Sequence, residues 1–264
     1  MTWIEFDKAK VAKVPDGDPI KLGFTELFPR AGHAKPESIE LAFNCYILIL
    51  GSRVVLIDAG IGAEKNRADY PDYHRRPAGF LEKLDNLGIS PGNVNYVVCT
   101  HLHPDHVGWN TILDEDDWVP TFSNAVYCFP QADFDHLADR YQGGERDRWQ
   151  MAAFADSILP VRKSGQCILF GLSLDLGGGL MVRQYSGHSP GHSAIFLTMD
   201  DCRLVFSGDV FHHPLQLENP DLRPVYDQDP SRAADSRKLL IGELKRRPTV
   251  LMPAHFAVTN YGCG

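Results

Sequence analysis

The stretch THLHPDHVGWN, residues 100–110, contains three histidines and one aspartate within six consecutive residues. It follows residues 94–99, a short β-branched run that predicts a strand. Zinc-like cations bind imidazole nitrogen and carboxylate oxygen in sites that stay open to water, whereas structural zinc sites favour cysteine. We therefore interpret the motif as a metal-binding loop rather than a histidine-rich surface loop. Its candidate ligands are His101, His103, Asp105 and His106.

Three further short motifs each follow a segment that predicts a strand. They are GHSPGH at 187–192, SGD at 207–209 and PAH at 253–255, after the apolar runs 180–185, 203–206 and 249–252. Binding sites in α/β proteins collect where strands end at their carboxyl edge. The three motifs add His188, Asp209 and His255 to the candidate ligands.

Taken in order, HLHPDH, GHSPGH, SGD and PAH resemble the ligand signature of the metallo-β-lactamase superfamily, over roughly residues 43–255. The resemblance implies an α/β (α+β) fold, a four-layer αββα sandwich with the metals at one edge. It also implies a dinuclear site, for which we expect two Zn²⁺ ions, with Mn, Co or Fe as alternatives. No repeat or low-complexity linker divides the chain, so we predict one domain over residues 1–264.

The resemblance also assigns the ligands. The first metal would take His101, His103 and His188, the second would take Asp105, His106 and His255, and Asp209 would bridge them. The β-lactamases proper have a cysteine where Asp209 stands. The chain is therefore more similar to the hydrolytic branch that contains N-acyl homoserine lactonases and methyl parathion hydrolase-like enzymes.

These residues predict an enzyme, a metal-dependent hydrolase. Two cations ~3.5 to 4 Å apart can hold a bridging water as hydroxide and polarise a carbonyl or phosphoryl oxygen. By resemblance to lactonases of this fold, Asp105 would pass a proton to the leaving alkoxide. His212 stands where some of these lactonases have a tyrosine that contacts the substrate, so we consider a catalytic contact there beside simple loop packing.

We expect hydrolysis of a lactone or carboxylic ester, with N-acyl homoserine lactone as the first substrate to test. Phosphotriester hydrolysis is the alternative, because methyl parathion hydrolase-like enzymes use nearly the same ligands. An iron-dependent oxidoreductase or sulfur dioxygenase on the same fold is a further alternative. We discount a non-catalytic member because all seven ligand positions are filled.

Several other residues have a weaker claim to the site. For His192 we favour a supporting or packing role over coordination, and Asn44 and Asp58 are candidates to orient the ligand loops through hydrogen bonds. One of His212 and His213 should face the metals. Four aromatic residues are interpreted as core rather than substrate pocket: Trp109, Trp118, Phe122 and Trp149.

Apolar periodicity predicts the remaining elements. The pattern around Gly51-Ser52 indicates a β-hairpin made of residues 43–50 and 53–58. Further strands are predicted at 125–129 and 194–199. Helices are predicted at 80–87, 131–140, 146–158 and 231–246, the last with Ser231 as N-cap.

Composition limits the partners and the location. The 26 basic and 34 acidic residues give a net charge of −8, which argues against nucleic acid as a partner. No secretory signal or membrane-spanning apolar run is evident, and six dispersed cysteines favour reduced thiols. We predict a soluble cytoplasmic protein that binds a small-molecule substrate and no membrane, and we leave a homodimer open.

Overall fold

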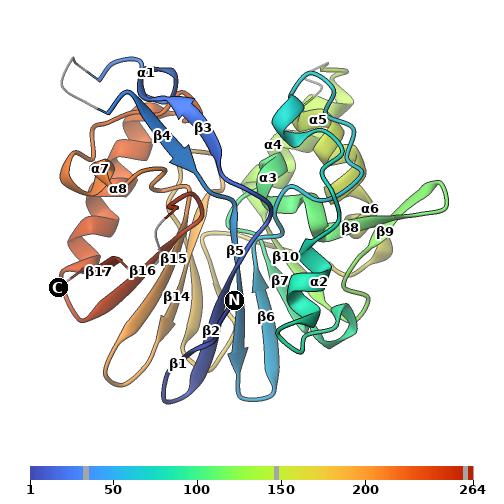
Figure 1. Cartoon of the computed structure of the whole chain (residues 1–264), viewed down its shortest axis with the longest axis horizontal. Helices are drawn as coiled ribbons and strands as arrows, with labels where there is room; N and C mark the ends of the chain where they lie inside the picture. The colour runs from blue at the N-terminus through green and yellow to red at the C-terminus, as the bar shows by residue number, and fades with distance from the viewer. Residues whose placement is uncertain (32–35, 146–148, 258–260, 264) are drawn as a thin grey trace. The chain divides into compact units, whose positions relative to one another are not determined.

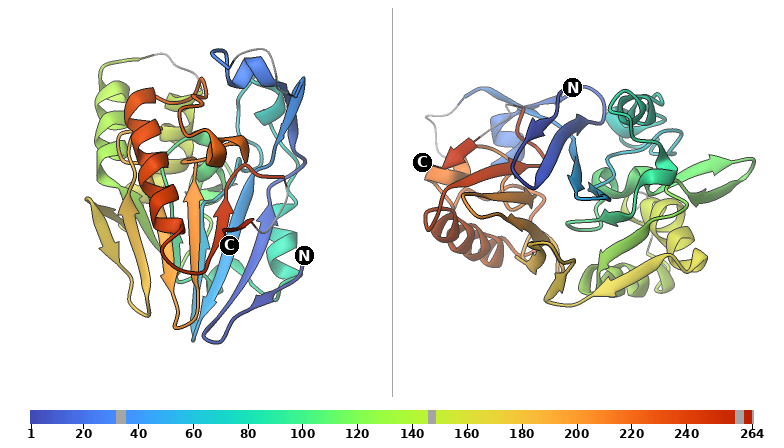
Figure 2. Two further views of the ribbon diagram at one scale, coloured as in Figure 1. Left: turned by 90° about the vertical axis from the view of Figure 1, so that its left-hand side faces the viewer. Right: turned by 90° about the horizontal axis from the view of Figure 1, so that it is seen from below.

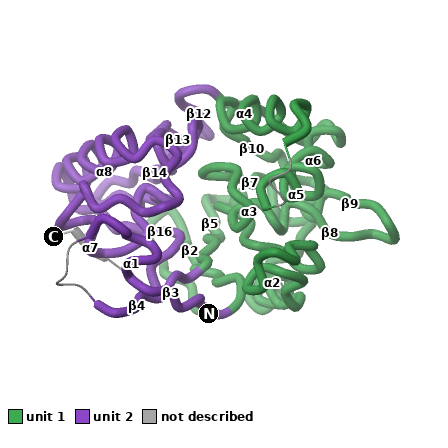
Figure 3. Tube along the Cα trace, turned by 90° about the horizontal axis from the view of Figure 1, so that it is seen from above, with its two compact units in different colours: residues 1–17, 43–170 green, residues 18–42, 171–264 purple. Residues whose placement is uncertain are grey.

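The computed structural model describes residues 1–31, 36–145, 149–257 and 261–263. For residues 261–263 it describes the backbone alone. The chain forms two compact units (Figure 3). Unit 1 contains residues 1–17 and 43–170, and unit 2 contains residues 18–42 and 171–264. The prediction of a single domain over residues 1–264 stays a prediction.

Unit 1 is built on a seven-stranded sheet with the order β1-β2-β5-β6-β7-β10-β11 (Figure 1). Its strands are β1 (Ile4–Glu5), β2 (Ala9–Pro15), β5 (Asn44–Leu50), β6 (Arg53–Ile57), β7 (Tyr96–Val98), β10 (Val126–Pro130) and β11 (Cys167–Phe170). Leu50 pairs with Arg53, which confirms the predicted hairpin. Strands β6, β7, β10 and β11 run parallel, so their carboxyl ends share one edge.

Helix α2 (Phe80–Asp85) packs on this sheet through apolar side chains on one of its faces. Phe80 and Leu84, one helical turn apart, lie in one buried cluster with Ile47 and Leu56 of the sheet. Trp109 and Phe122 belong to the same cluster, as expected of core residues. The remaining elements of unit 1 are η1 (Pro71–Tyr73), α2 (Phe80–Asp85), η2 (Pro91–Asn93), α3 (Pro104–Val107), η3 (Gly108–Asn110), the hairpin β8 (Thr111–Asp114) and β9 (Asp117–Pro120), α4 (Gln131–Gln142), α5 (Gln150–Ala153), the π-helix η4 (Phe154–Ile158) and α6 (Leu159–Ser164).

Unit 2 contains a six-stranded sheet with the order β12-β13-β14-β15-β16-β17. Helix α8 (Pro230–Leu244) runs along this sheet (Figure 2), where Leu240 and Leu244 pack with Phe196 and Val205. The elements of unit 2 are the pair β3 (Ile20–Gly23) and β4 (Ser38–Leu41), α1 (Phe24–Leu27), β12 (Ser173–Asp175), β13 (Leu180–Gln184), β14 (Ser193–Thr198), β15 (Arg203–Gly208), α7 (Leu215–Glu218), α8 (Pro230–Leu244), β16 (Thr249–Pro253) and β17 (Tyr261–Cys263). Within the described residues no helix has the length and apolar character needed to cross a membrane.

Two of the helix predictions need correction. The helix predicted to start at Ser231 has Asp229 as its N-cap, because the Asp229 carboxylate accepts from the Arg232 amide and Pro230 fits the first helical position. The helix predicted over 146–158 continues to Ser164 and ends at Gly165, which has a φ of 82°. Residues 146–148 of that prediction lie outside the described residues.

The segment after the histidine-rich motif is held by an unusually close backbone approach. The Gly108 amide donates to Gly60 O at 2.7 Å, and the Trp109 amide donates to Ala59 O at 2.7 Å. A Cβ placed on Gly108 would lie 1.8 Å from Ile61 O. Only glycine fits here, so the loop after β6 fixes the end of the motif.

We predict that Gly108→Ala lowers the free energy of unfolding by about 1 to 3 kcal/mol, because the added methyl group has to displace backbone atoms. Urea unfolding of the two proteins measures the difference. Gly171→Ala is the control, because an added Cβ there meets nothing within 4 Å and the residue does not have a left-handed φ. Equal stability of Gly108→Ala and the parent would contradict the observed packing.

A second buried feature of unit 1 is a lysine among polar partners. The Lys65 ammonium lies 2.7 Å from Thr111 Oγ1, 3.8 Å from Asp156 Oδ1 and 3.4 Å from the centre of the Trp118 ring. Burial lowers the pKa of Lys65 to about 7, although the Asp156 carboxylate acts in the opposite direction. Trp118, interpreted from the sequence as a core residue, therefore packs against this lysine.

This lysine makes stability depend on pH. Between the folded pKa of about 7 and the ordinary value of 10.5, the unfolded chain binds more protons at Lys65 than the folded chain does. The contribution of Lys65 to stability therefore increases as pH rises through this window, with a slope of at most about 1.4 kcal/mol per pH unit. Below the window the contribution is constant.

We predict that the unfolding free energy of the parent, minus that of Lys65→Met, rises between pH 7.5 and 9.5. Urea unfolding at several pH values measures it, and subtracting the variant cancels groups that titrate equally in both proteins. A pH-independent difference would show that Lys65 keeps an ordinary pKa.

Candidate metal centre

The histidine-rich motif forms a compact cluster within unit 1. It follows β7, and His103 is the N-cap of the short helix α3, with Pro104 at the first helical position. The ring centroids of His101 and His106 are 4.0 Å apart, and those of His101 and His103 are 4.5 Å apart. His106 Nε2 lies 3.8 Å from Asp105 Oδ2. Within this unit, the structure therefore brings together the four candidate ligands predicted from residues 100–110.

Asp58, at the end of β6, orients this cluster. Its Oδ2 lies 2.9 Å from His106 Nδ1, and its Oδ1 accepts from the Thr100 amide at 2.7 Å. The Thr100 hydroxyl also donates to Asp58. A carboxylate at Nδ1 holds the proton there and leaves Nε2 as the nitrogen that can coordinate a metal. This agrees with the expected role of Asp58, and Asn44 is buried at the start of β5.

Two residues that sequence reasoning missed hold the backbone between the first two histidines. Asp133 of α4 accepts from the Leu102 amide at 3.0 Å, and Gln150 of α5 donates to the Leu102 carbonyl at 2.7 Å. Both side chains belong to buried residues. Their burial is a property of the tertiary structure, so the sequence offered no signal for either residue.

Unit 2 contains its own candidate cluster, centred on one carboxylate oxygen. Asp209 Oδ2 lies 2.9 Å from His255 Nε2, 3.2 Å from His212 Nε2 and 3.3 Å from His188 Nε2. All four residues are buried. Ligand atoms of His188, Asp209 and His212 lie within 4.8 Å of one another, close enough to hold one ion.

Three histidines of unit 2, His192, His212 and His213, make different contacts in and around this cluster. His212, rather than His213, contacts Asp209. His213 Nδ1 accepts from the Leu215 amide at 3.2 Å, its ring meets Phe24 edge-on, and burial lowers its pKa. His192 Nε2 accepts from the Asp209 amide at 2.9 Å, so it holds the backbone of Asp209, in agreement with the supporting role expected for it.

Acceptors within unit 2 also fix two of the candidate ligand rings. His255 Nδ1 lies 2.7 Å from Ala42 O, and His188 Nδ1 lies 3.2 Å from Asp227 Oδ1. Asp227 is paired with Arg237 at 3.1 Å. Burial raises the pKa of Asp227, partly offset by nearby positive groups including Arg237. Neither residue stands in a recognisable motif, so sequence reasoning did not find them.

The residues present fit a divalent cation of the zinc type. Each unit presents imidazole nitrogens beside a carboxylate, and the Nδ1 atoms of His106, His188 and His255 are occupied by oxygen acceptors. Such rings offer Nε2 as a neutral donor, which is the form that binds zinc.

Comparison with known proteins gives the family context. The model of the family described as "Metallo-beta-lactamase superfamily" matches residues 40–255. Among curated relatives, the chain is 23% identical over 227 residues to "Probable metallo-hydrolase YqjP" of Bacillus subtilis (strain 168), covering 79% of this chain and 65% of the relative. It is 26% identical over 138 residues to "N-acyl homoserine lactonase AttM" of Azorhizobium caulinodans, covering 47% and 44%. The chain thus spans less than two thirds of the length of these relatives.

A solved structure, that of the dizinc quorum-quenching lactonase AidC with the product N-hexanoyl-L-homoserine, is similar in fold. It superposes with a TM-score of 0.78 at 18% identity, over 97% of this chain and 90% of that one. The predicted fold class is confirmed, and the relatives' names agree with the prediction of a metal-dependent hydrolase. Because the family model matches most of its length, the chain belongs to the metallo-beta-lactamase superfamily.

Proposed function

We propose that this protein is a dinuclear metal-dependent hydrolase that opens a lactone or cleaves a carboxylic ester. The observation that carries the proposal is the buried Asp209 carboxylate, which has three imidazole nitrogens within 3.3 Å. Carboxylates surrounded by neutral imidazoles are typical of catalytic metal sites rather than of structural zinc sites.

The proposed ligands are those that the motifs indicate. His101, His103 and His188 would bind one ion, Asp105, His106 and His255 the other, and Asp209 would bridge them. Zinc is the metal we propose, because imidazole and carboxylate are its usual ligands in catalytic sites, and manganese, cobalt or iron are alternatives. Support comes from the clusters in the two units, each described above.

The bound metals would supply an activated water and would polarise the substrate carbonyl. Asp105 is suited to move protons, because its side chain is 15% exposed whereas that of His106 is only 2% exposed. In lactone opening, water adds to the carbonyl carbon and the bond from that carbon to the ring oxygen breaks. We propose that Asp105 takes up a proton from the attacking water and passes it to the departing oxygen.

His212 is proposed to contact the substrate carbonyl. Its backbone amide donates to Gln216 Oε1 at 2.7 Å, and its ring stacks on His255 with a centroid distance of 5.4 Å. These contacts fix the ring next to Asp209. A fixed imidazole N–H can stabilise negative charge as it develops on the carbonyl oxygen.

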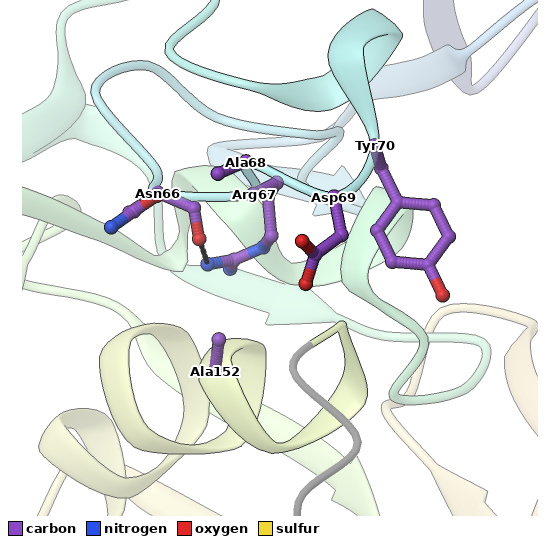
Figure 4. Close-up of a pocket in the computed structure, with 6 residues that line it drawn as sticks. All are labelled: Asn66, Arg67, Ala68, Asp69, Tyr70 and Ala152. Carbon is purple, nitrogen blue, oxygen red and sulfur yellow. Dashed lines mark hydrogen bonds between the residues drawn. The ribbon is translucent and has the colours of Figure 1, made fainter.

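A pocket in unit 1 is the proposed place for an apolar part of the substrate. This cavity of about 250 Å³ lies between Asn66–Tyr70 and Ala152 of α5 (Figure 4). Helix α5 is tied to the metal-binding loop by the bond from Gln150 to Leu102 O. Trp149, interpreted from sequence as core, packs instead on Tyr70 and Tyr73 at the surface of this region, with centroid distances of 4.7 and 4.3 Å.

N-acyl homoserine lactones are the first substrates we propose. One curated relative is named an N-acyl homoserine lactonase, and the AidC structure contains the product N-hexanoyl-L-homoserine. Phosphotriester hydrolysis is the alternative, since it needs the same polarising cations. We also propose a cytoplasmic location, supported by the free thiols of Cys45, Cys99, Cys128, Cys167 and Cys202, and leave a homodimer open.

The first test of the function is metal removal together with Asp105→Asn. We predict that chelation abolishes lactone hydrolysis and that added Zn²⁺ restores it. Asp105→Asn should lower kcat/KM by about 10² to 10⁴, the range of general acid–base catalysis. Asp135→Asn, which changes an exposed aspartate on α4, is the matched control and should keep full activity. Full activity of the metal-free protein would overturn the proposal.

The second test addresses the substrate class. Initial rates on N-acyl homoserine lactones, aryl esters and aryl phosphotriesters, with metal content measured on the same samples, should show the highest kcat/KM for lactones. A preference for phosphotriesters would favour phosphotriester hydrolysis as the function. Bound iron together with oxygen consumption would indicate an iron-dependent oxidoreductase or sulfur dioxygenase.

A further inference from the structure

A buried ion pair stands behind one of the candidate ligands of unit 2. Arg237 Nη1 lies 3.1 Å from Asp227 Oδ2, and both side chains are 0% exposed. Arg237 Nε also donates to Pro220 O at 2.7 Å, which fixes the plane of the guanidinium group. Arg237 comes from α8 and Asp227 from the segment that precedes this helix.

The other oxygen of this aspartate faces His188. Asp227 Oδ1 lies 3.2 Å from His188 Nδ1, while His188 Nε2 lies 3.3 Å from Asp209. Two backbone bonds tie the same segments together: Gln228 N donates to His188 O, and Asp229 N donates to Gly187 O. The side chains therefore form a chain of contacts from Arg237 through Asp227 and His188 to Asp209.

The stability of the fold does not explain this pair. Removing two charges from water is costly, and replacing a buried ion pair by apolar side chains is often neutral or stabilising. Helix α8 already has an apolar face, with Leu240 and Leu244 in the core of unit 2. A buried pair of this kind is best explained by what it does for the imidazole that it contacts.

The partners of His188 differ in charge from those of His106 in unit 1. Asp58 has neutral additional donors, the amide and hydroxyl of Thr100. Asp227 instead has a guanidinium group. A carboxylate shared with arginine pulls less strongly on the imidazole proton, because its charge is already balanced. His188 should therefore be a weaker donor than His106, but one with a strictly fixed orientation.

We propose that Asp227 and Arg237 are positioning residues for His188, which keep its proton on Nδ1 and hold Nε2 toward the metal. This inference rests on the proposed function, since it assumes that His188 is a ligand. Asp227 fixes the ring, and Arg237 fixes Asp227. Neither residue touches the substrate.

The test is metal binding by a variant in which the ion pair is replaced by apolar side chains, Asp227→Leu/Arg237→Met. No unpaired charge remains buried in this double variant, so the apo-protein should stay folded. Zn²⁺ affinity, from competition with a chromophoric chelator, should fall 10- to 100-fold for one of the two ions. The visible spectrum of the Co²⁺-loaded protein should change as well, since one ligand is no longer fixed.

Glu243→Gln is the matched control. Glu243 lies on the same helix, pairs with Arg183 and accepts from the Tyr185 hydroxyl, but it contacts none of the candidate ligands in the described structure. This variant should lower the thermal stability of the apo-protein and leave Zn²⁺ affinity and the Co²⁺ spectrum unchanged.

The outcomes separate the inference from the function on which it rests. If the parent protein binds no metal, the proposed function fails. If the parent binds two ions and the folded double variant binds them with the same affinity and spectrum, the positioning role is wrong. Should the double variant not fold, Asp227→Ala/Arg237→Leu, which also removes both charges and the acceptor at His188 Nδ1, replaces it. Parent-like affinity and a parent-like Co²⁺ spectrum in this folded variant would equally contradict the inference.

Discussion

The carboxylate of Asp209 contacts three imidazole rings in the interior of unit 2, and the candidate site depends on how that charge is balanced. Its Oδ2 lies 2.9 to 3.3 Å from the Nε2 atoms of His188, His212 and His255. A buried carboxylate is stable only when it is hydrogen-bonded, paired with a cation or bound to a metal. Neutral imidazoles provide limited compensation, whereas divalent cations bound by His188 and His255 would balance the carboxylate and use the lone pairs of these two rings.

The orientation of the candidate ligands follows from what holds the far nitrogen of each ring. His106 is held by Asp58, His188 by Asp227 and His255 by the carbonyl of Ala42. The three acceptors differ in charge. The Asp58 carboxylate has neutral donors, the Asp227 carboxylate is paired with Arg237, and the Ala42 carbonyl is neutral. The rings therefore differ in the electron density that they can give to a cation, which is a means to make two metal positions unequal.

Much of this arrangement could be predicted from the sequence, because metal ligands combine unusual residue types with short spacing. The motif at residues 100–110, the strand before it and the hairpin at Gly51 follow from local patterns. Asp133, Gln150, Asp227 and Arg237 do not, since single polar residues become informative only when tertiary packing buries them. The N-cap of α8 was misplaced because Ser231 and Asp229 are both good caps, and Pro230 between them is compatible with only the latter.

The central claim is that the seven predicted ligands bind a pair of cations. A crystal structure of the zinc-loaded protein, with anomalous data collected on both sides of the zinc absorption edge, tests it most directly. The account predicts two zinc peaks ~3.5 to 4 Å apart, ligated by His101, His103, Asp105, His106, His188, Asp209 and His255. A single peak, none, or a pair held by other side chains would contradict it.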